Sequence, residues 1–544
     1  MGQGRRWSML ELSDVCVTLP AGGNRHRVLD HVCLDVAPGE RVALVGANGS
    51  GKSTIACVCN GALVPNGGGV SVDGVGGLSR DELARLVGRV RQDPQSQIVS
   101  SVVWDEVSFG PRNLGWAHDR VESAVGEALQ ECNIAHLAGR STASLSGGEA
   151  QRVALAGVLA MHPSYLVLDE ALAQLDPGAR RGVRGIVRAL LSHGVGVLDI
   201  THLEEDALSA DRVVVLDAGR VVWEGRPWEL AASGSVVRLS GLQGGRLRAL
   251  EALGWPSLGA DAPWPPDAGK LALMASEGGL ERELSDACLL VQGEPKAAGK
   301  GARGLSLDGV TVSYEAEKPA LASATLRVEP GHVCLVVGPS GSGKSTLALA
   351  ASGLVGPDSG AVTLDGSPVR PGDVGLAFQR PENQLFCATA LEDVAFGPLN
   401  RGQSREWALA KARDALGLLG VGPDLWDRAP LSLSGGERRR VALAGVVAMG
   451  QAAFVFDEPT AGLDGPSRSL MRNLVRRLAE RGAAILVVTH DVGEWLPVAT
   501  DGCLLRAGSV AWSGPACGLL DPATYERAGM EPPFEAQLWE ALHG

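Results

Sequence analysis

The stretch RVALVGANGSGKST, from Arg41 to Thr54, decides the fold of the first half of the chain. A short apolar run ends in glycine, a glycine-rich turn follows, and the next residues, TIACVCNGAL, lack strand alternation and indicate a helix. Glycines in such a turn let backbone N–H groups converge on an anion, and the helix N-terminus adds its dipole. The order strand, loop and helix therefore predicts a phosphate site. We expect Lys52 to reach the β- and γ-phosphates of a nucleotide and Ser53 to bind Mg²⁺.

The chain repeats this pattern and three others. VCLVVGPSGSGKST brings in Lys344 and Ser345. LSGGE begins at 145 and 433, LVLDE at 166 answers FVFDE at 454, and ITH at 200 answers VTH at 488, all three at an offset of 288 residues. The repeats predict a tandem duplication of a domain of about 230 residues, far longer than a solenoid repeat.

Composition sets limits on the class of protein. The chain has 544 residues, 45% hydrophobic and 20% charged, which suits two to four globular domains. It lacks an apolar run of the roughly 18 residues that a membrane-spanning helix needs, and its start lacks a signal-peptide core, so we expect a cytoplasmic protein. The net charge of −13 argues against nucleic acid as a partner. Ten cysteines lack paired metal-ligand spacing, and Cys57 with Cys59 indicates helix packing rather than a metal site.

The predicted domain organisation places a distinct connector between the two copies. Proline-rich APWPPDAG, at 262–269, is followed by a helical segment and then by GEPKAAGKGARG. We expect a first domain at 8–235, its C-terminal extension at 236–292, a flexible linker at 293–304 and a second domain at 305–544. The linker, fully extended, spans roughly 40 Å, which would let the two domains face each other.

Two pairs of acids follow strand-like segments. YLVLDE and AFVFDE are near-continuous apolar runs, typical of central strands of a parallel sheet covered on both faces. At the carboxyl end of such a strand, Asp169 or Asp457 can reach the Mg²⁺ shell, and the following Glu170 or Glu458 can orient or deprotonate an attacking water. A solvated strand end is the alternative, and the neighbouring phosphate loop disfavours it. LSGGE alone indicates a helix cap that could bind an anion, and Arg438 to Arg440 indicate a basic face on a solvated helix.

Taken together, these motifs resemble the ATP-binding cassette (ABC) ATPases over most of both halves. GANGSGKS and GPSGSGKS are similar to the Walker A loop, LVLDE and FVFDE to the Walker B strand, and LSGGE to the family signature. Gln92 and Gln379 match the Q-loop, and His202 and His490 the switch histidine. The resemblance implies an α/β fold of two P-loop NTPase domains, each with a mainly parallel central sheet, an antiparallel edge sheet and a helical subdomain. It also implies ATP and Mg²⁺ as cofactors and ATP hydrolysis coupled to transport.

The resemblance further implies that the two domains close head to tail, so that each Walker A loop is completed by the other domain's signature. One site would combine Lys52, Ser53, Gln92, Asp169, Glu170 and His202 with Ser434, Gly435 and Gly436. The other would combine Lys344, Ser345, Gln379, Asp457, Glu458 and His490 with Ser146, Gly147 and Gly148. The loops would add Gly46, Asn48, Gly49, Gly51 and Thr54, or Gly338, Ser340, Gly341, Gly343 and Thr346. The Mg²⁺ ligands would be Ser53, Gln92 and Asp169, or Ser345, Gln379 and Asp457.

The two copies also differ. Tyr314 stands where the family stacks an aromatic ring on adenine, and Leu19 takes that place in the first half. Loss of a stacking ring costs roughly 1–3 kcal/mol in other base-binding sites, which predicts weaker nucleotide binding at the first Walker A loop. The first half has DEALAQLD where the second has DEPTAGLD, although Asp176 and Asp464 are both present. We expect two hydrolytic sites of unequal quality.

A turn-rich octapeptide occurs twice, as SFGPRNLG at 108–115 and AFGPLNRG at 395–402. Together with the preceding acids it resembles the Q-helix region of energy-coupling factor (ECF) importers, which faces a membrane scaffold subunit. The resemblance implies a peripheral protein at the cytoplasmic face of the cell membrane, with a separate membrane subunit that binds the substrate. The implied docking residues are Asp105, Glu106, Phe109, Glu392, Asp393 and Phe396. A helix cap with a Gly-Pro turn is the simpler alternative.

Three functions fit these motifs. The first is the energizing ATPase of an ECF importer for a vitamin or metal ion. The second is the fused ATPase of a peptide or sugar importer, although sugar-type tandem ATPases usually carry a degraded site and both sites are intact here. The third is a ribosome-binding translation factor, which typically joins its domains by a charged helical hairpin that this connector does not resemble.

Overall fold

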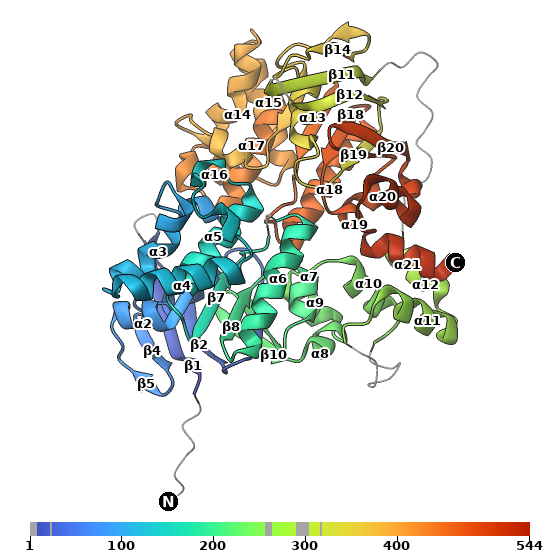
Figure 1. Ribbon diagram of the computed structural model, residues 1–544. Helices are drawn as coiled ribbons and strands as arrows, with labels where there is room; N and C mark the ends of the chain where they lie inside the picture. The colour runs from blue at the N-terminus through green and yellow to red at the C-terminus, as the bar shows by residue number, and fades with distance from the viewer. Residues whose placement is uncertain are drawn as a thin grey trace, which may run out of the picture. The chain divides into compact units, whose positions relative to one another are not determined.

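The computed structural model describes residues 8–21, 24–173, 175–255, 264–289, 304–315 and 318–543 (Figure 1). It contains two compact units. Unit 1 comprises Met1–Gln243 and Gly254–Pro265, and unit 2 comprises Gly244–Leu253 and Pro266–Gly544. The linker predicted at 293–304 lies, apart from its last residue, outside the described residues.

The central sheet of unit 1 has six strands in the order β10-β9-β3-β8-β7-β6. Neighbours pair in parallel except β10 with β9, which are antiparallel. Every residue of β3, β7 and β8 is buried, because helices cover both faces of a parallel sheet. The strands are β3 (Arg41–Val45), β6 (Val87–Val90), β7 (Tyr165–Asp169), β8 (Gly196–Ile200), β9 (Arg212–Asp217) and β10 (Arg220–Gly225).

A second, antiparallel sheet of unit 1 has the order β2-β1-β4-β5. It is formed by β1 (Leu10–Ala21), β2 (Asn24–Val36), β4 (Gly67–Val72) and β5 (Val75–Gly76). Its inner face shares one apolar core with β3 and α1 (Lys52–Cys59), through Leu12, Leu44 and Ile55 among others. This core fixes the start of α1 against the end of β3, which is where the phosphate loop lies.

Helices α3 (Val103–Asn113), α4 (His118–Glu131) and α5 (Gly147–Leu159) pack on one another and form the predicted helical subdomain of unit 1 (Figure 1). Their core includes Val107, Val125 and Val153. The remaining helices of unit 1 are α2 (Arg80–Leu86), α6 (Pro177–Ser192), α7 (Glu204–Leu208), α8 (Pro227–Ala231) and α9 (Gly234–Ser240).

Unit 2 repeats this architecture. Its six-stranded sheet has the order β16-β17-β18-β13-β19-β20 and its antiparallel sheet the order β12-β11-β14-β15. The strands are β11 (Leu305–Glu315), β12 (Lys318–Val328), β13 (Val333–Val337), β14 (Ser359–Leu364), β15 (Ser367–Pro368), β16 (Val374–Ala377), β17 (Ala453–Asp457), β18 (Ala484–Val488), β19 (Asp501–Arg506) and β20 (Ser509–Pro515). The predicted α/β fold class is therefore confirmed in both copies.

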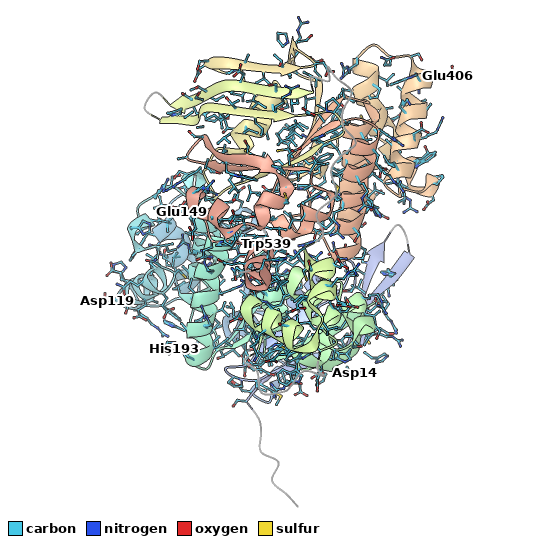
Figure 2. The ribbon with its side chains drawn as sticks, turned by 90° about the vertical axis from the view of Figure 1, so that its right-hand side faces the viewer. Asp14, Asp119, Glu149, His193, Glu406 and Trp539 are labelled. Carbon is cyan, nitrogen blue, oxygen red and sulfur yellow. The ribbon has the colours of Figure 1, made fainter. Side chains whose placement is uncertain are left out.

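The helices of unit 2 include a matching helical subdomain, formed by α14 (Ala390–Asn400), α15 (Arg405–Leu418) and α17 (Gly435–Ala448). The others within the repeat are α13 (Lys344–Ala351), α16 (Pro423–Trp426), α18 (Gly465–Glu480), α19 (Val492–Trp495), α20 (Pro522–Ala528) and α21 (Phe534–His543). Trp539 lies on α21 (Figure 2), and its ring stacks on that of His543.

Three helices that precede the linker in sequence belong to unit 2. They are α10 (Gly245–Ala252), α11 (Ala268–Gly278) and α12 (Glu281–Cys288), and all three contact α21. Buried Leu250, Leu271 and Leu538 contribute to this packing. The sequence predicts residues 236–292 as a C-terminal extension of the first domain. In the structure, the helices α10, α11 and α12 of this segment pack with α21, the last helix of the chain.

No helix in the described part of the chain combines the length and the apolar character that crossing a bilayer requires.

Candidate functional site

The phosphate loop of unit 1 joins β3 to α1. Gly51 caps α1 at φ 107, a left-handed conformation, and a Cβ there would lie 2.7 Å from Leu29 Cδ2. Only glycine fits this position without strain. Lys52 is buried and donates from Nζ to the carbonyl oxygens of Gly46 at 2.7 Å and Ala47 at 2.9 Å. The loop and the ammonium group therefore surround a cradle that suits nucleotide phosphates.

Unit 2 repeats this geometry between β13 and α13. Gly343 caps α13 at φ 102, and a Cβ there would lie 2.4 Å from Ala320 O. Lys344 donates from Nζ to the carbonyl oxygens of Gly338 at 2.8 Å and Pro339 at 2.9 Å. The two halves thus carry the same loop conformation, as their shared sequence predicts.

The acid at the end of each Walker B strand meets the serine that follows the loop lysine. Ser53 Oγ donates to Asp169 Oδ1 at 3.0 Å, and Asp169 is buried. In unit 2 Ser345 hydrogen-bonds Asp457, whose pKa rises to about 6 because burial and then the neighbouring Glu458 disfavour its charge. A hydroxyl beside a carboxylate supplies the hard oxygen ligands that Mg²⁺ prefers. The residues present therefore fit the expected metal.

The second acid of each pair lies beside the switch histidine. His202 Nδ1 is 3.7 Å from Glu170 Oε2, and His490 Nδ1 is 2.9 Å from Glu458 Oε2. Glu170 and Glu458 have φ angles of 53° and 48°. A left-handed glutamate at the same position of both copies is a strained backbone of the kind found at functional sites. It turns each carboxylate away from the strand and towards the histidine at the end of the next strand.

The Q-loop glutamines follow the edge strands β6 and β16. Gln92 is half-buried and Gln379 is exposed. Their roles as Mg²⁺ ligands remain predictions.

The signature serines cap helices. Ser146 begins α5 and Ser434 begins α17, and each hydroxyl accepts from the backbone N–H of a glutamate three residues on, while that glutamate accepts from the serine N–H at 2.8 Å. Glu149, in the first turn of α5, is therefore a capping residue (Figure 2). These bonds lower the pKa of both glutamates, Glu149 and Glu437. Completion of either nucleotide site by the other unit's signature remains a prediction.

Arginines hold the segment that follows Glu170 or Glu458 in both units, and unit 2 uses an additional one. In unit 1 Arg180, on α6, donates to the carbonyl oxygens of Leu172 and Ala173. In unit 2 Arg468, on α18, donates from Nε to the carbonyl oxygen of Leu463 at 3.0 Å. In addition, Arg439, on α17, donates to the carbonyl oxygens of Pro459 at 2.9 Å and Ala461 at 3.0 Å. Asp176 and Asp464 have the same role in both units, since each caps the following helix.

Arg439 corrects the prediction of a solvated basic face at 438–440. Its side chain is buried, with 9% of the residue exposed. The helical period contained the signal, because Arg439 lies three and four residues before buried Ala442 and Leu443. The prediction rested on the charge of the three arginines, whereas the helical repeat places the middle one on the buried face of α17.

The acids predicted for docking separate into two kinds. Glu106 is buried, and its Oε2 accepts from the N–H groups of Val99 at 2.8 Å and Ser100 at 2.7 Å. Asp393 Oδ2 likewise accepts from Phe386 at 2.8 Å and Cys387 at 2.7 Å. These two carboxylates therefore stabilise their own loops. Asp105 and Glu392 are exposed, as are Phe109 and Phe396, at 49% and 39%.

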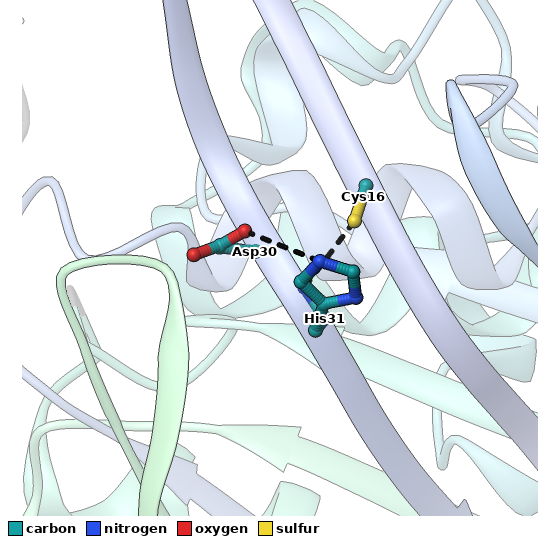
Figure 3. Close-up of side chains that lie close together, drawn as sticks. All are labelled: Cys16, Asp30 and His31. Atoms are coloured by element: carbon teal, nitrogen blue, oxygen red, sulfur yellow. Dashed lines mark hydrogen bonds and ion pairs between the residues drawn. The ribbon is translucent and has the colours of Figure 1, made fainter.

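A separate cluster of potential metal ligands lies on the antiparallel sheet of unit 1, where Cys16, Asp30 and His31 meet (Figure 3). Arg27 and Arg220 both form ion pairs with Asp30, and they lower its pKa. His31 Nδ1 lies 2.6 Å from Asp14 Oδ1. Two guanidinium groups on the central carboxylate make this cluster a poor place for a cation.

These geometries define a pair of P-loop ATPase domains, each with a phosphate loop, an acid hydrogen-bonded to the loop serine and a glutamate beside a histidine. The profile of the family described as ABC transporter matches residues 29–173 and 321–461. The chain belongs to this family, and it is an ATP-hydrolysing ABC transporter ATPase that uses ATP with Mg²⁺.

Several known proteins are similar to this chain. A putative ABC transporter ATP-binding protein of Bifidobacterium longum is 34% identical over 518 residues, which cover 90% of this chain and 64% of that protein. One of Caldanaerobacter subterraneus is 30% identical over 508 residues, covering 89% of this chain and 88% of its own length. Among solved structures, cbiO1 of Clostridium perfringens, part of the ABC transporter complex cbiONQ, is 33% identical, covers 42% of this chain and 93% of its own, and has a TM-score of 0.38.

The family chemistry predicts a task for several side chains of each unit. When bound, ATP with Mg²⁺ supplies an activated terminal phosphoryl group whose charge the metal partly neutralises. That Lys52 and Lys344 present ammonium groups to the phosphates remains a prediction. So do the roles of Glu170 and Glu458 as proton acceptors from water, and of His202 and His490 in orienting these carboxylates.

Proposed function

We propose that this chain is the energizing ATPase of an ECF-type importer that takes up a vitamin or a metal ion. The observation that carries the proposal is an exposed acid four residues before an exposed phenylalanine, present once in each unit. Asp105 precedes Phe109 on α3, and Glu392 precedes Phe396 on α14. Residues four apart share one face of a helix. Each helical subdomain thus offers a small surface with an acid beside an aromatic ring, and in unit 1 the acid also forms an exposed ion pair with Arg112 of its own helix at 3.3 Å.

The chemistry of this surface suits a cationic, partly apolar partner helix. An exposed phenylalanine is an anchor that favours burial in an interface, and a rim carboxylate steers and orients a basic partner. In unit 2 the surface is larger, because Phe386 packs edge-on against Phe396 with ring centroids 4.7 Å apart. The Q-helix resemblance of both segments supports a membrane scaffold subunit as that partner. We therefore place the chain at the cytoplasmic face of the cell membrane.

In the proposed cycle, ATP binding closes the two units head to tail and hydrolysis lets them open. Each Walker A loop would face the other unit's signature, as the family resemblance implies. Because both units are in one chain, closure is intramolecular. The movement of α3 and α14 would be passed on to the scaffold, and a separate membrane subunit would bind the substrate.

Affinity purification from detergent-solubilised cells tests this proposal. The tagged chain should retain an integral scaffold protein and a small multi-helix binding subunit, identified by mass spectrometry. The double variant Phe109→Ala/Phe396→Ala should bind both at least roughly thirtyfold more weakly, because the two alanines together remove anchors worth about 2–4 kcal/mol. Leu273→Ala, which removes an exposed leucine on α11, is the matched control and should retain them.

The outcomes distinguish the alternatives. A scaffold that co-purifies with a soluble or lipid-anchored binding protein would indicate a peptide or sugar importer. Ribosomal proteins without any membrane protein would overturn the transport proposal. Full retention of the scaffold by the double variant would place the docking surface elsewhere on the chain.

A further inference from the structure

The magnesium acid of unit 1 already carries a positive partner. Arg89 lies on β6, beside the Walker B strand β7, and its Nη2 is 2.6 Å from Asp169 Oδ2. The side chains of this ion pair are 15% and 8% exposed. The other carboxylate oxygen accepts from Ser53. Both oxygens of Asp169 are therefore engaged, one of them by a permanent cation, since arginine keeps its charge in proteins.

The guanidinium group is fixed by a second contact. Arg89 Nη1 donates to Cys57 Sγ at 3.0 Å, and Cys57 lies on α1, the helix that begins at the phosphate loop. Arg89 thus joins the edge strand, the Walker B acid and the phosphate-binding helix. Burial restricts its freedom to swing away from Asp169.

Unit 2 lacks both parts of this arrangement. The register is the same, since Arg89 pairs with Val167 in unit 1 and Leu376 pairs with Val455 in unit 2. Leu376 therefore occupies the place of Arg89, and Leu349 on α13 occupies that of Cys57. At this position the unit 2 site has an apolar side chain where unit 1 has a cation.

We infer that Arg89 is a built-in cation of the first nucleotide site, which competes with Mg²⁺ for Asp169 and makes nucleotide binding there less dependent on Mg²⁺ than at the second site. To bind Asp169, the metal must displace the guanidinium group or share the carboxylate with it. Without the metal, Arg89 still neutralises Asp169, so the carboxylate repels the phosphates less. In unit 2 no residue at the matching position does this for Asp457.

Nucleotide affinity with and without Mg²⁺ tests the inference on the full chain. Lys344→Ala isolates the first site and Lys52→Ala the second, and the affinity for a fluorescent ATP analogue is measured in EDTA and in saturating Mg²⁺. The ratio that matters is the dissociation constant in EDTA divided by the dissociation constant in Mg²⁺. It should be smaller at the first site. Arg89→Leu should raise that ratio, and lower the Mg²⁺ concentration for half-saturation, on the order of tenfold, as for other residues that adjust metal ligands.

Matched variants separate charge from structure. Arg85→Leu removes an exposed arginine of the neighbouring helix α2 and should leave the ratio unchanged. Arg89→Lys keeps a positive charge and should stay closer to the native protein than Arg89→Leu does. Leu376→Arg in the Lys52→Ala chain should make the second site less dependent on Mg²⁺.

Two results would overturn the inference. The first is an unchanged ratio in Arg89→Leu, or affinities that fall equally with and without Mg²⁺, since either indicates a purely structural arginine. The second is an unchanged ratio in Leu376→Arg, which decides the matter if Arg89→Leu does not fold.

Discussion

At the residue scale, the two nucleotide sites differ where adenine is expected to stack. Tyr314 is 62% exposed, whereas Leu19 packs against the core of unit 1. An exposed ring can bury its surface against a ligand, whereas a packed leucine has little free surface. The sequence already predicts this difference, because VTVSYE has a tyrosine where VCVTLP has a leucine.

Replacing Tyr314 should therefore weaken one site selectively. We expect Tyr314→Leu to cost about 1–3 kcal/mol in ATP affinity, which is roughly fivefold to 150-fold. The measurement is binding of a fluorescent ATP analogue to the Lys52→Ala chain, in which the second site acts alone. Tyr314→Phe keeps the ring and should bind like the parent. Equal affinity in all three chains would remove the stacking role.

The second site should also respond to pH through Asp457. Its pKa is raised to about 6 by burial and by Glu458. Only the deprotonated carboxylate binds Mg²⁺ well, so Mg²⁺ affinity should fall about tenfold per pH unit below pH 6 and level off above pH 7. Binding of Mn²⁺ as a spectroscopic substitute, followed by electron paramagnetic resonance in the Lys52→Ala chain, measures this.

Glu458→Gln provides the check on that profile. It removes the neighbouring negative charge, so the pKa of Asp457 should fall and the curve should move to lower pH. Protonation of the nucleotide itself is common to both chains and cancels in the comparison. A curve that stays in place, or moves to higher pH, contradicts the assignment to Asp457.

At the scale of elements, strands β3 and β8 of unit 1 carry charges where β13 and β18 of unit 2 carry valines. Arg41 forms ion pairs with Asp199 and Asp206, and Arg184 forms a second ion pair with Asp206. All but Arg184 are buried. The matching positions to Arg41 and Asp199 are Val333 and Val487. The same sheet position is thus filled by an ion pair in one copy and by apolar packing in the other.

The ion pair of Arg41 with Asp199 allows a test of stability, in which both residues are replaced by the valines that unit 2 has at the matching positions. Arg41→Val alone leaves Asp199 buried without its partner and should cost about 3–5 kcal/mol. The double variant Arg41→Val/Asp199→Val should recover most of that loss, because replacing a buried pair by apolar groups is often neutral or stabilising. Hydrogen exchange of the β3 and β8 peptides measures the opening free energy locally. A double variant no more stable than the single one contradicts this expectation.

The elements that could be predicted from the sequence are those with strong periodicity. Buried runs such as YLVLD are central strands, and glycine-rich turns before helices are phosphate loops, because few other conformations satisfy those residues. Glu106, Asp393 and Arg89 were not predictable in their roles. The sequence pattern does not distinguish an acid that caps its own loop from one that contacts a partner. Arg89 faces Asp169 because of the register in which β6 pairs with β7, and that register cannot be read from the sequence.

At the scale of the whole molecule, the two copies share the groups predicted to be catalytic and differ in what surrounds them. Both copies retain the loop lysine, the magnesium acid and the glutamate–histidine pair. They differ in the residue expected to stack on adenine and in the residue beside the Walker B aspartate. They also differ in the arginine contacts of the segment that follows Glu170 or Glu458. Each of these differences lies outside the short motifs, so motif matching alone describes the two sites as equal.

The packing of α10, α11 and α12 on α21 means that a cut within the linker does not give two self-sufficient halves. A fragment that stops near residue 289 would keep these three helices but lose α21, against which they pack, and it should aggregate or be degraded. Co-expression of residues 1–289 with the remainder should restore a soluble pair, held by this packing and by the ion pair of Arg248 with Glu535 at 3.6 Å. Moving the break to residue 243 should yield a soluble second fragment on its own. A two-gene version of this protein would therefore place its boundary before α10, not within the linker.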